Sequence, residues 1–271
     1  MSENSRDGKS SLLEKLVPAL VVICVALAFL VGVLWQKVEN INNGGKTTTG
    51  TTDTTQKAPE QIKVSIDQIK GLFDKDVIKF GNKDSKLIFV EASDPSCPYC
   101  HIAAGLNSKL NNEVGSQFKL VKDGGTYVAP VAEMKKLVDS GKASFVWLYF
   151  NGHGNGELGT KAMYCAYEKG KFWEAHDLLM SAEGYELLNT TVKNDKAQTG
   201  KLADFLKSAV NVSDMKSCLD SGKYDERLAS DMALGTELGV SGTPGFFINE
   251  TNFAGAYSYT DMESVVTSAL K

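Results

Sequence analysis

Two of the five cysteines stand three positions apart in the segment Cys97-Pro98-Tyr99-Cys100. On a helix this spacing brings both side chains onto one turn, where their sulfur atoms can form a disulfide. Pro98 fits the first helical turn, because the N–H that proline lacks would have no partner there. A helix N-terminus also favours a thiolate through its unpaired N–H groups and partial positive charge. We expect Cys97 to point to solvent with a lowered pKa and Cys100 to be the buried resolving thiol.

The chemistry that this pair indicates is thiol–disulfide exchange. A substrate thiolate would attack the Cys97 sulfur of the disulfide form, make a mixed disulfide and release Cys100. A second substrate thiolate would then resolve the mixed disulfide, so that the substrate gains the bond. A stabilised Cys97 thiolate makes the reduced protein more stable and its disulfide more oxidising.

A cysteine pair at this spacing also occurs as half of a zinc site. A second ligand pair is missing, because Cys165 and Cys218 are isolated from each other and from any nearby cysteine. The histidines are widely spaced: His101, His153 and His176. A purely structural disulfide within one helical turn would be unusual. We therefore expect redox chemistry at the pair, without a metal or a cofactor.

The elements that must position the pair can be read from hydrophobic patterning. Residues 87–90 form a continuous apolar run, which is typical of a strand buried on both faces. Residues 144–150 and 245–248 are two further runs of this kind. After the cysteine pair, apolar residues recur at helical spacing: Ile102, Leu106 and Leu110.

The rest of the folded region reads as helical. The segment between the second and third apolar runs includes Phe172 and Trp173, and it predicts a helical insertion in an α/β core. Thr260 and Glu263 predict a capping box for a C-terminal helix. Within residues 118–142, a short amphipathic helix of open role is suggested by Met134, Leu137 and Val138.

Three motifs together resemble one family. They are the Cys97–Cys100 segment after a strand, the helical segment 162–179 with Gly170-Lys171-Phe172-Trp173, and Gly239-Val240-Ser241-Gly242-Thr243-Pro244 before Phe246. In these motifs the sequence resembles the DsbA-like branch of the thioredoxin superfamily, near its membrane-anchored BdbD-type proteins. The resemblance covers roughly residues 85–110 and 160–271. It implies a thioredoxin-like fold and an oxidoreductase that introduces disulfides into exported proteins.

The resemblance also assigns roles to three residues outside the cysteine pair. Thr243-Pro244 would be the cis-proline loop that faces the disulfide and pairs with the substrate backbone; the alternative is an ordinary turn before a strand. Glu91 would lie beneath Cys100 and exchange its proton; the alternative is a strand-end residue that faces solvent. We expect Asp94 to be a turn residue.

The dipeptide between the cysteines departs from the pattern of the strongly oxidising relatives, which often carry histidine there. Pro98-Tyr99 also occurs in glutaredoxins and in some DsbG-like isomerases, so the redox direction stays open. His101 stands four positions after Cys97, on the same helical face, and could partly replace the missing histidine. The alternative is an exposed helix residue.

Relatives of this type often carry cysteines in the contexts of Cys165 and Cys218. The resemblance therefore implies a structural disulfide that clamps the helical insertion, for which the loop-entropy model gives roughly 4 kcal/mol; the alternative is two buried free thiols. A structural disulfide belongs in an oxidising compartment, so we expect the folded domain outside the cytoplasm.

The N-terminal region predicts membrane attachment. Residues 16–35 are uncharged and long enough to span a bilayer, and they are not followed by the small residues of a signal-peptide cleavage site. Cys24, within this segment, is expected to be a passive small hydrophobe. The expected organisation is a cytoplasmic tail (1–15), a single transmembrane anchor (16–36), a flexible Thr-rich linker (37–60) and a folded domain (61–271).

Composition limits the partners. A net charge of −4 gives no support to nucleic-acid binding. Reduced exported proteins are the expected substrates, and the resemblance implies a DsbB- or VKOR-type membrane partner that reoxidises the pair. Two other functions stay open: a disulfide isomerase or reductase of the DsbG type, and a non-catalytic chaperone or binding module with the same fold.

Overall fold

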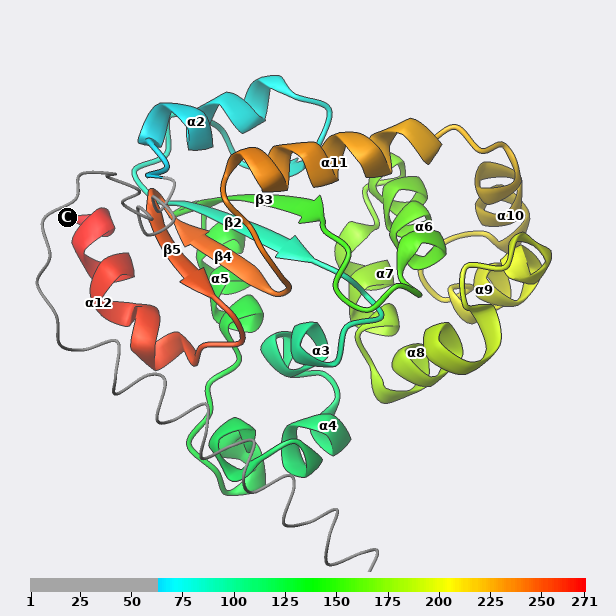
Figure 1. The fold of residues 1–271 in the computed structure, drawn as a ribbon, viewed down its shortest axis with the longest axis horizontal. Coiled ribbons are helices and arrows are strands. Elements are labelled where there is room, and N and C mark those ends of the chain that lie inside the picture. Colours follow the sequence, from blue (N-terminus) through cyan, green and yellow to red (C-terminus); the bar gives the residue numbers. More distant parts are fainter. Residues whose placement is uncertain (1–62) are drawn as a thin grey trace, which may run out of the picture. The chain divides into compact units, whose positions relative to one another are not determined.

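The computed structural model describes residues 63–271, which form a five-stranded sheet between two layers of helices (Figure 1). The strand order is β1-β3-β2-β4-β5. The central strands β2 (Ile88–Ser93) and β3 (Ser144–Tyr149) are parallel. The outer strands are antiparallel to their neighbours: β1 (Ile78–Phe80) to β3, β4 (Gly245–Ile248) to β2, and β5 (Thr251–Ala254) to β4.

Every residue of β2 and β3 is buried, which explains the apolar runs at residues 87–90 and 144–150 of the sequence. The three strands that the sequence predicts are present as β2, β3 and β4. The edge strands β1 and β5 are only three and four residues long, and β5 is largely exposed. Neither has the continuous apolar run that marks a central strand.

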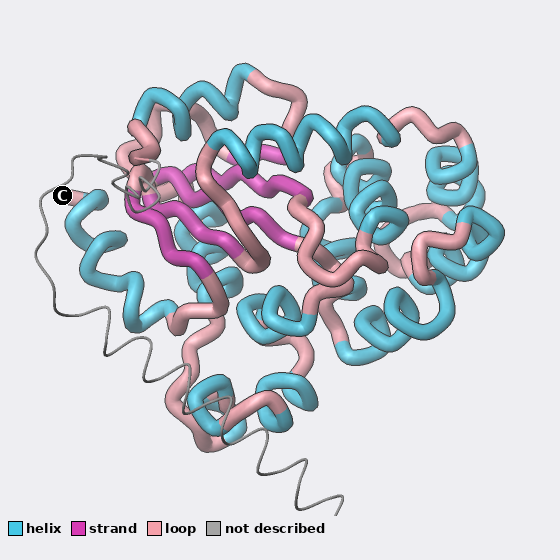
Figure 2. The backbone as a smooth tube through the Cα atoms, in the orientation of Figure 1, coloured by secondary structure: helices cyan, strands magenta, loops and turns pink. Residues whose placement is uncertain are grey.

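Helices precede β1, separate β2 from β3 and β3 from β4, and follow β5; Figure 2 draws helices in cyan and strands in magenta. Their bounds are α2 (Ile66–Gly71), α3 (Pro98–Ala104), α4 (Ser108–Glu113), α5 (Pro130–Asp139), α6 (Glu157–Glu168), α7 (Phe172–Leu179), α8 (Ala182–Glu186), α9 (Thr199–Phe205), α10 (Val212–Asp220), α11 (Asp225–Glu237) and α12 (Tyr259–Leu270). Single turns of 3₁₀ helix occupy 72–74, 116–118, 121–123 and 196–198, and 187–192 is a short π-helix.

The two faces of the sheet have separate cores. On one face Ile88 and Val90 of β2 pack beneath α2 and α11. On the other face Phe89 of β2 and Trp147 of β3 pack against α3, α5, α6, α7 and α12. Because successive side chains of a strand point to opposite faces, Glu91 belongs to this second face.

The predicted helical insertion is present, and it runs from α6 to α10 between β3 and α11 (Figure 1). Cys165 on α6 and Cys218 on α10 are joined by a disulfide with a Cα–Cα distance of 6.1 Å. The disulfide that the resemblance implies is therefore in place, and it holds the first and last helices of the insertion together.

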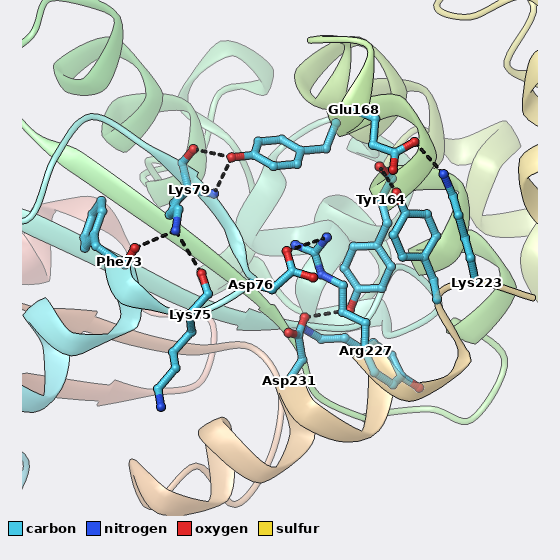
Figure 3. Close-up of polar contacts among 12 residues, drawn as sticks. Phe73, Lys75, Asp76, Lys79, Tyr164, Glu168, Lys223, Arg227 and Asp231 are labelled. Carbon is cyan, nitrogen blue, oxygen red and sulfur yellow. Dashed lines mark hydrogen bonds and ion pairs between the residues drawn. The ribbon is translucent and has the colours of Figure 1, made fainter.

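A buried polar network joins the insertion to α11 and the sheet (Figure 3). Asp231 of α11 accepts hydrogen bonds from the Tyr149 backbone N–H at 3.0 Å and from the Tyr164 hydroxyl at 2.6 Å. The Arg227 guanidinium lies over the Tyr164 ring and 3.4 Å from Asp76. Burial raises the pKa of Asp231 to about 6.

Two local predictions can be compared with the helices. The amphipathic helix in 118–142 is α5, and its Met134 is buried against the sheet core. The predicted capping box of Thr260 and Glu263 is wrong: the box of α12 lies two residues earlier, with Ser258 as the N-cap and its N–H donating to Asp261 at 3.2 Å. Ser258 also accepts a hydrogen bond from the Val128 N–H, which fixes where the helix starts.

Within residues 63–271, no helix is both long and apolar enough to cross a bilayer. The predicted tail, anchor and linker, residues 1–60, lie outside the described residues, as does Cys24.

Candidate active site

Helix α3 holds the cysteine pair at its start. Cys97 is the N-cap residue with extended backbone angles, and Pro98 occupies the first turn as the sequence predicts. Both thiols are free. Cys100 is fully buried, and Cys97 is only 4% exposed. The expectation that Cys97 points to solvent is therefore wrong, because neighbouring segments and Met180 pack around it.

The two thiols have opposite electrostatic environments. The pKa of Cys97 is lowered to about 6, chiefly by a hydrogen bond from the Cys100 thiol and also by the Thr243 side chain and the N–H groups of Cys100 and Tyr99, against the opposing effect of burial. Burial, together with the Cys97 charge, raises the pKa of Cys100 far above its ordinary value. At neutral pH Cys97 is thus the thiolate and Cys100 the protonated thiol.

The loop before β4 forms the second wall of the site. The Thr243–Pro244 peptide bond is cis, in agreement with the resemblance. The Thr243 carbonyl oxygen lies 3.5 Å from the Cys97 sulfur. Because β4 pairs with β2, this loop is held at the same end of the sheet as the start of α3.

A third wall, which the sequence analysis missed, is the Gly-rich loop of residues 151–156 after β3. A Cβ atom added to Gly152 would lie 1.7 Å from the Thr243 hydroxyl oxygen and 3.3 Å from the Cys97 Cβ. Only glycine fits such a close approach. His153, the next residue, is exposed beside the site. Since β2 and β3 are parallel, the loops at their carboxyl ends meet at one edge, and this topological rule could have revealed the contact.

Asp94 anchors this Gly-rich loop. Its Oδ2 accepts hydrogen bonds from the N–H groups of Gly152 and His153, both at 2.9 Å. Its Oδ1 accepts from the Ser96 N–H and hydroxyl, both at 2.7 Å. Asp94 is thus the turn residue that the sequence predicts, and also a buried bridge between two walls of the site.

Glu91 lies inside the protein, not at a solvent-facing strand end. It is fully buried, and neither carboxyl oxygen has a hydrogen-bond partner within residues 63–271. Burial raises its pKa, partly offset by the nearby charge of His176 and by the Ser93 hydroxyl. The same hydroxyl also lowers the pKa of Cys100.

Both hypotheses for His101 are wrong. The ring is fully buried, with Nδ1 2.9 Å from the Met180 carbonyl and Nε2 2.8 Å from the Pro95 carbonyl. Its face is covered by Tyr185. Burial lowers the pKa of His101 to about 4, so it carries no charge to offer Cys97 near neutral pH. It instead joins α3 to the insertion.

Tyr99 is the exposed member of the cysteine segment. Its side chain is 44% exposed and packs edge-on against Phe118. It therefore lies at the rim of the site, where a bound polypeptide would meet it. In the described part of the chain, no group of three or more His, Cys, Asp or Glu side chains gathers to hold a metal.

A family model described as thioredoxin matches residues 129–268, more than half of the 271 residues. The match includes the Cys165–Cys218 disulfide and the Thr243–Pro244 loop and begins after the Cys97–Cys100 segment.

Two relatives illustrate the similarity in sequence. The Na(+)/H(+) antiporter NhaA 3 of Salinispora tropica is 26% identical over 203 residues, 72% of this chain and 25% of the antiporter. The chain thus spans about a quarter of that relative's length. A putative protein-disulfide oxidoreductase of Rickettsia bellii is 24% identical over 222 residues, 80% of this chain and 75% of the relative.

Among solved structures, α-DsbA1 of Wolbachia pipientis has a TM-score of 0.53 at 15% identity, covering 72% of this chain and 91% of that protein. At this identity the likeness shows the fold, which agrees with the sheet order and the helical insertion described above. With the family match over residues 129–268, it leads to one conclusion: the chain belongs to the thioredoxin family.

Proposed function

We propose that this protein is a thiol–disulfide oxidoreductase that introduces disulfides into exported proteins through Cys97 and Cys100. The observation that carries the proposal is the difference in pKa between the two thiols. Cys97 is favoured as a thiolate and Cys100 as a thiol, at the start of one helix and beside the Thr243–Pro244 loop. A pair made unequal in this way can exchange its bond with a substrate in a defined order.

In the first step a substrate thiolate attacks the Cys97 sulfur of the Cys97–Cys100 disulfide. The bond between the two sulfurs breaks, its electron pair leaves on Cys100, and a mixed disulfide joins Cys97 to the substrate. The buried Cys100 thiolate must gain a proton, which Glu91 supplies across the Ser93 hydroxyl.

In the second step another substrate thiolate attacks the substrate sulfur of the mixed disulfide. Cys97 leaves as a thiolate, which its lowered pKa makes a good leaving group. The substrate has lost two electrons and the cysteine pair has gained them. A disulfide-bearing membrane partner of the DsbB or VKOR type would then take these electrons and restore the pair.

The direction of exchange follows from the stabilised Cys97 thiolate. Stabilisation of the reduced form makes the disulfide more oxidising, by about 30 mV for each 1.4 kcal/mol. This argument favours oxidation of substrates, although Tyr99 stands where strongly oxidising relatives often carry histidine.

Two assays on the full-length protein test the proposal. Oxidised protein should speed the refolding of a reduced, denatured disulfide protein, and the Cys97→Ser variant should not. Insulin reduction by the same protein should be slow. Fast insulin reduction without oxidative refolding would instead indicate an isomerase or reductase, and inactivity in both assays a binding module.

The proposed location is the outer face of a membrane, with residues 16–36 as a single-pass anchor. The proposal is supported by the uncharged segment 16–35 and by the Cys165–Cys218 disulfide, which suits an oxidising compartment. Protease added to intact cells should then degrade residues 61–271 and spare residues 1–15. Protection of the folded domain under these conditions would contradict the proposal.

A further inference from the structure

A cluster of buried polar atoms without partners lies behind the cysteine pair. Within residues 63–271, hydrogen-bond partners are missing for both carboxyl oxygens of Glu91, the hydroxyl of Ser93 and the Nε2 atom of His176. Buried polar groups are rarely left unpaired, and those that are often have a functional reason.

The three side chains lie on the same face of the sheet, and no direct hydrogen bond joins them within residues 63–271. Glu91 and Ser93 stand two positions apart on β2 and therefore point to the same face. Trp147 is the register partner of Glu91, and its ring packs on Phe172, which packs in turn on His176 of α7. When it is protonated, His176 also lowers the pKa of Glu91, so the two groups are close.

His176 connects this interior cluster to solvent. The ring is 1% exposed, but its Nδ1 lies 2.9 Å from a carboxylate oxygen of Asp177, whose side chain is 52% exposed. A carboxylate can only accept a hydrogen bond, so Nδ1 carries the proton. In the neutral ring Nε2 then has a free lone pair inside the protein, which can accept a proton.

We propose that His176 and Asp177 are the outer part of a proton path that joins Cys100, through Ser93 and Glu91, to solvent. This inference rests on the proposed function, since the path serves the exchange reactions of the cysteine pair. His176 and Asp177 act through Glu91 and do not touch the substrate. Both are therefore positioning residues, and their role is to carry the proton to and from Glu91.

The path balances the proton of each half-reaction. When the pair is reoxidised, Cys100 attacks the Cys97 sulfur of a mixed disulfide with the partner, and the partner thiolate leaves with the electron pair. The side chains of Ser93, Glu91 and His176 are not hydrogen-bonded to one another in the described residues, so the transfer requires that they rotate into contact. The Cys100 proton then passes across Ser93 to Glu91, whose carboxylic acid accepts on one oxygen and donates from the other to His176 Nε2. The Nδ1 proton leaves through Asp177.

After this passage the proton of His176 is on Nε2 instead of Nδ1. That tautomer can donate inward when the next substrate thiolate opens the disulfide and Cys100 needs a proton, while Nδ1 regains a proton from Asp177 or solvent. In the structure, with both thiols free, the contact between Nδ1 and Asp177 favours the tautomer that accepts on Nε2. The tautomer of His176 should therefore depend on the redox state of the cysteine pair.

Other charged groups near His176 come from three elements. Glu91 faces it from β2, and His101 of α3 is close enough for the charge of His176 to lower its pKa further. Lys135 of α5 lies over the neighbouring Trp173 ring, 5.3 Å from its centroid. None of these side chains is hydrogen-bonded to the ring in the described part of the chain, so Asp177 is the exit that the geometry offers.

The first test is spectroscopic and does not need turnover. The chain has three histidines, so nitrogen NMR of the full-length, ¹⁵N-histidine-labelled protein in detergent can be assigned with the His176→Gln variant. The expected result is the Nδ1–H tautomer in the reduced protein and the Nε2–H tautomer in the oxidised protein. The same tautomer in both redox states would overturn the inference.

The second test is the rate of disulfide formation in the reduced protein after addition of glutathione disulfide. His176→Gln and Asp177→Asn should each slow closure of the Cys97–Cys100 bond about tenfold, since general acid–base catalysis is worth at least that much. Both should also reduce the solvent deuterium isotope effect. Asp177→Asn leaves the ring in place, so it serves if His176→Gln fails to fold.

Glu174→Gln is the matched control, because Glu174 is an exposed carboxylate on the same helix that pairs with Lys171. Its rates should equal those of the wild type. Wild-type rates and isotope effects in both His176→Gln and Asp177→Asn would contradict the proton path and leave the proposed function standing. If the wild-type pair itself fails to exchange, the proposed function falls, and the two failures are thus distinguishable.

Discussion

The two cysteine pairs of this protein carry the same chemistry in different surroundings. Cys165 and Cys218 are bonded across 53 positions, and the bond joins two helices of the insertion. Cys97 and Cys100 are three positions apart and free, and their neighbours lower the pKa of one and raise that of the other. A lasting disulfide thus needs only suitable geometry, whereas an exchanging pair needs neighbours that treat its two sulfurs unequally.

The largest difference between the pairs should appear in activity. Cys97→Ser should lower the rate of disulfide transfer to a reduced substrate by more than about a thousandfold, because the attacked sulfur is lost. The double variant Cys165→Ala/Cys218→Ala should keep the rate within about threefold under conditions where it is folded. Oxidative refolding assays measure both, and equal losses in the two variants would remove the distinction.

The second difference should appear in stability. Loss of the Cys165–Cys218 bond should lower the free energy of unfolding by about 4 kcal/mol, since the unfolded chain regains the entropy of a long open loop. Cys97→Ser should change it far less. Urea unfolding followed by circular dichroism measures both, and a loss below about 1 kcal/mol in the double variant would show that helix packing alone holds the insertion.

The inequality within the exchanging pair should appear as pH dependence. Only the thiolate reacts with iodoacetamide, so the Cys97 rate should rise with pH through a midpoint near 6 and level off above pH 7. At pH 7 Cys97 should have roughly thirtyfold more thiolate than an ordinary cysteine, whose pKa is about 8.5. The rate that disappears in Cys97→Ser isolates this reaction, and a midpoint near 8.5 would contradict the proposed role.

The smallest predicted effect lies in the network beside the structural disulfide. Because burial raises the pKa of Asp231 to about 6, the folded state keeps a proton that the unfolded state has already lost near pH 4. Wild-type stability should therefore fall as pH rises from about 4 to 6.

Asp231→Asn removes this fall, and its amide oxygen can still accept from Tyr149 and Tyr164. The stability of the variant relative to wild type should increase by on the order of 1 kcal/mol between pH 4 and 7. Thermal melts at the two pH values measure it. A constant difference would mean that Asp231 is ionised throughout this range.

The parts of the fold that sequence predicts are those with a strong local signal. β2, β3 and β4 appear as apolar runs, and Pro98 together with the cysteine spacing marks the start of α3. The cis bond at Pro244 and the Cys165–Cys218 pairing came from the family resemblance. Neither follows from local propensity, since cis bonds are a minority even before proline.

The parts that sequence missed depend on distant segments. The buried face of α3 is decided by Met180 and Tyr185, about eighty positions away, so the environment of His101 could not be read from its own helix. The wall at Gly152 needs the parallel pairing of β2 with β3. The burial of Glu91 requires helices on both faces of the sheet.

The bond between Cys165 and Cys218 also bears on how each new molecule matures. If the proposed activity holds, every newly made copy must itself acquire a disulfide before it can introduce disulfides into other proteins. Copies made while the compartment lacks oxidising power would lack the Cys165–Cys218 bond and would have a lower free energy of unfolding. The supply of working protein would then follow the oxidising capacity that the protein itself helps to sustain.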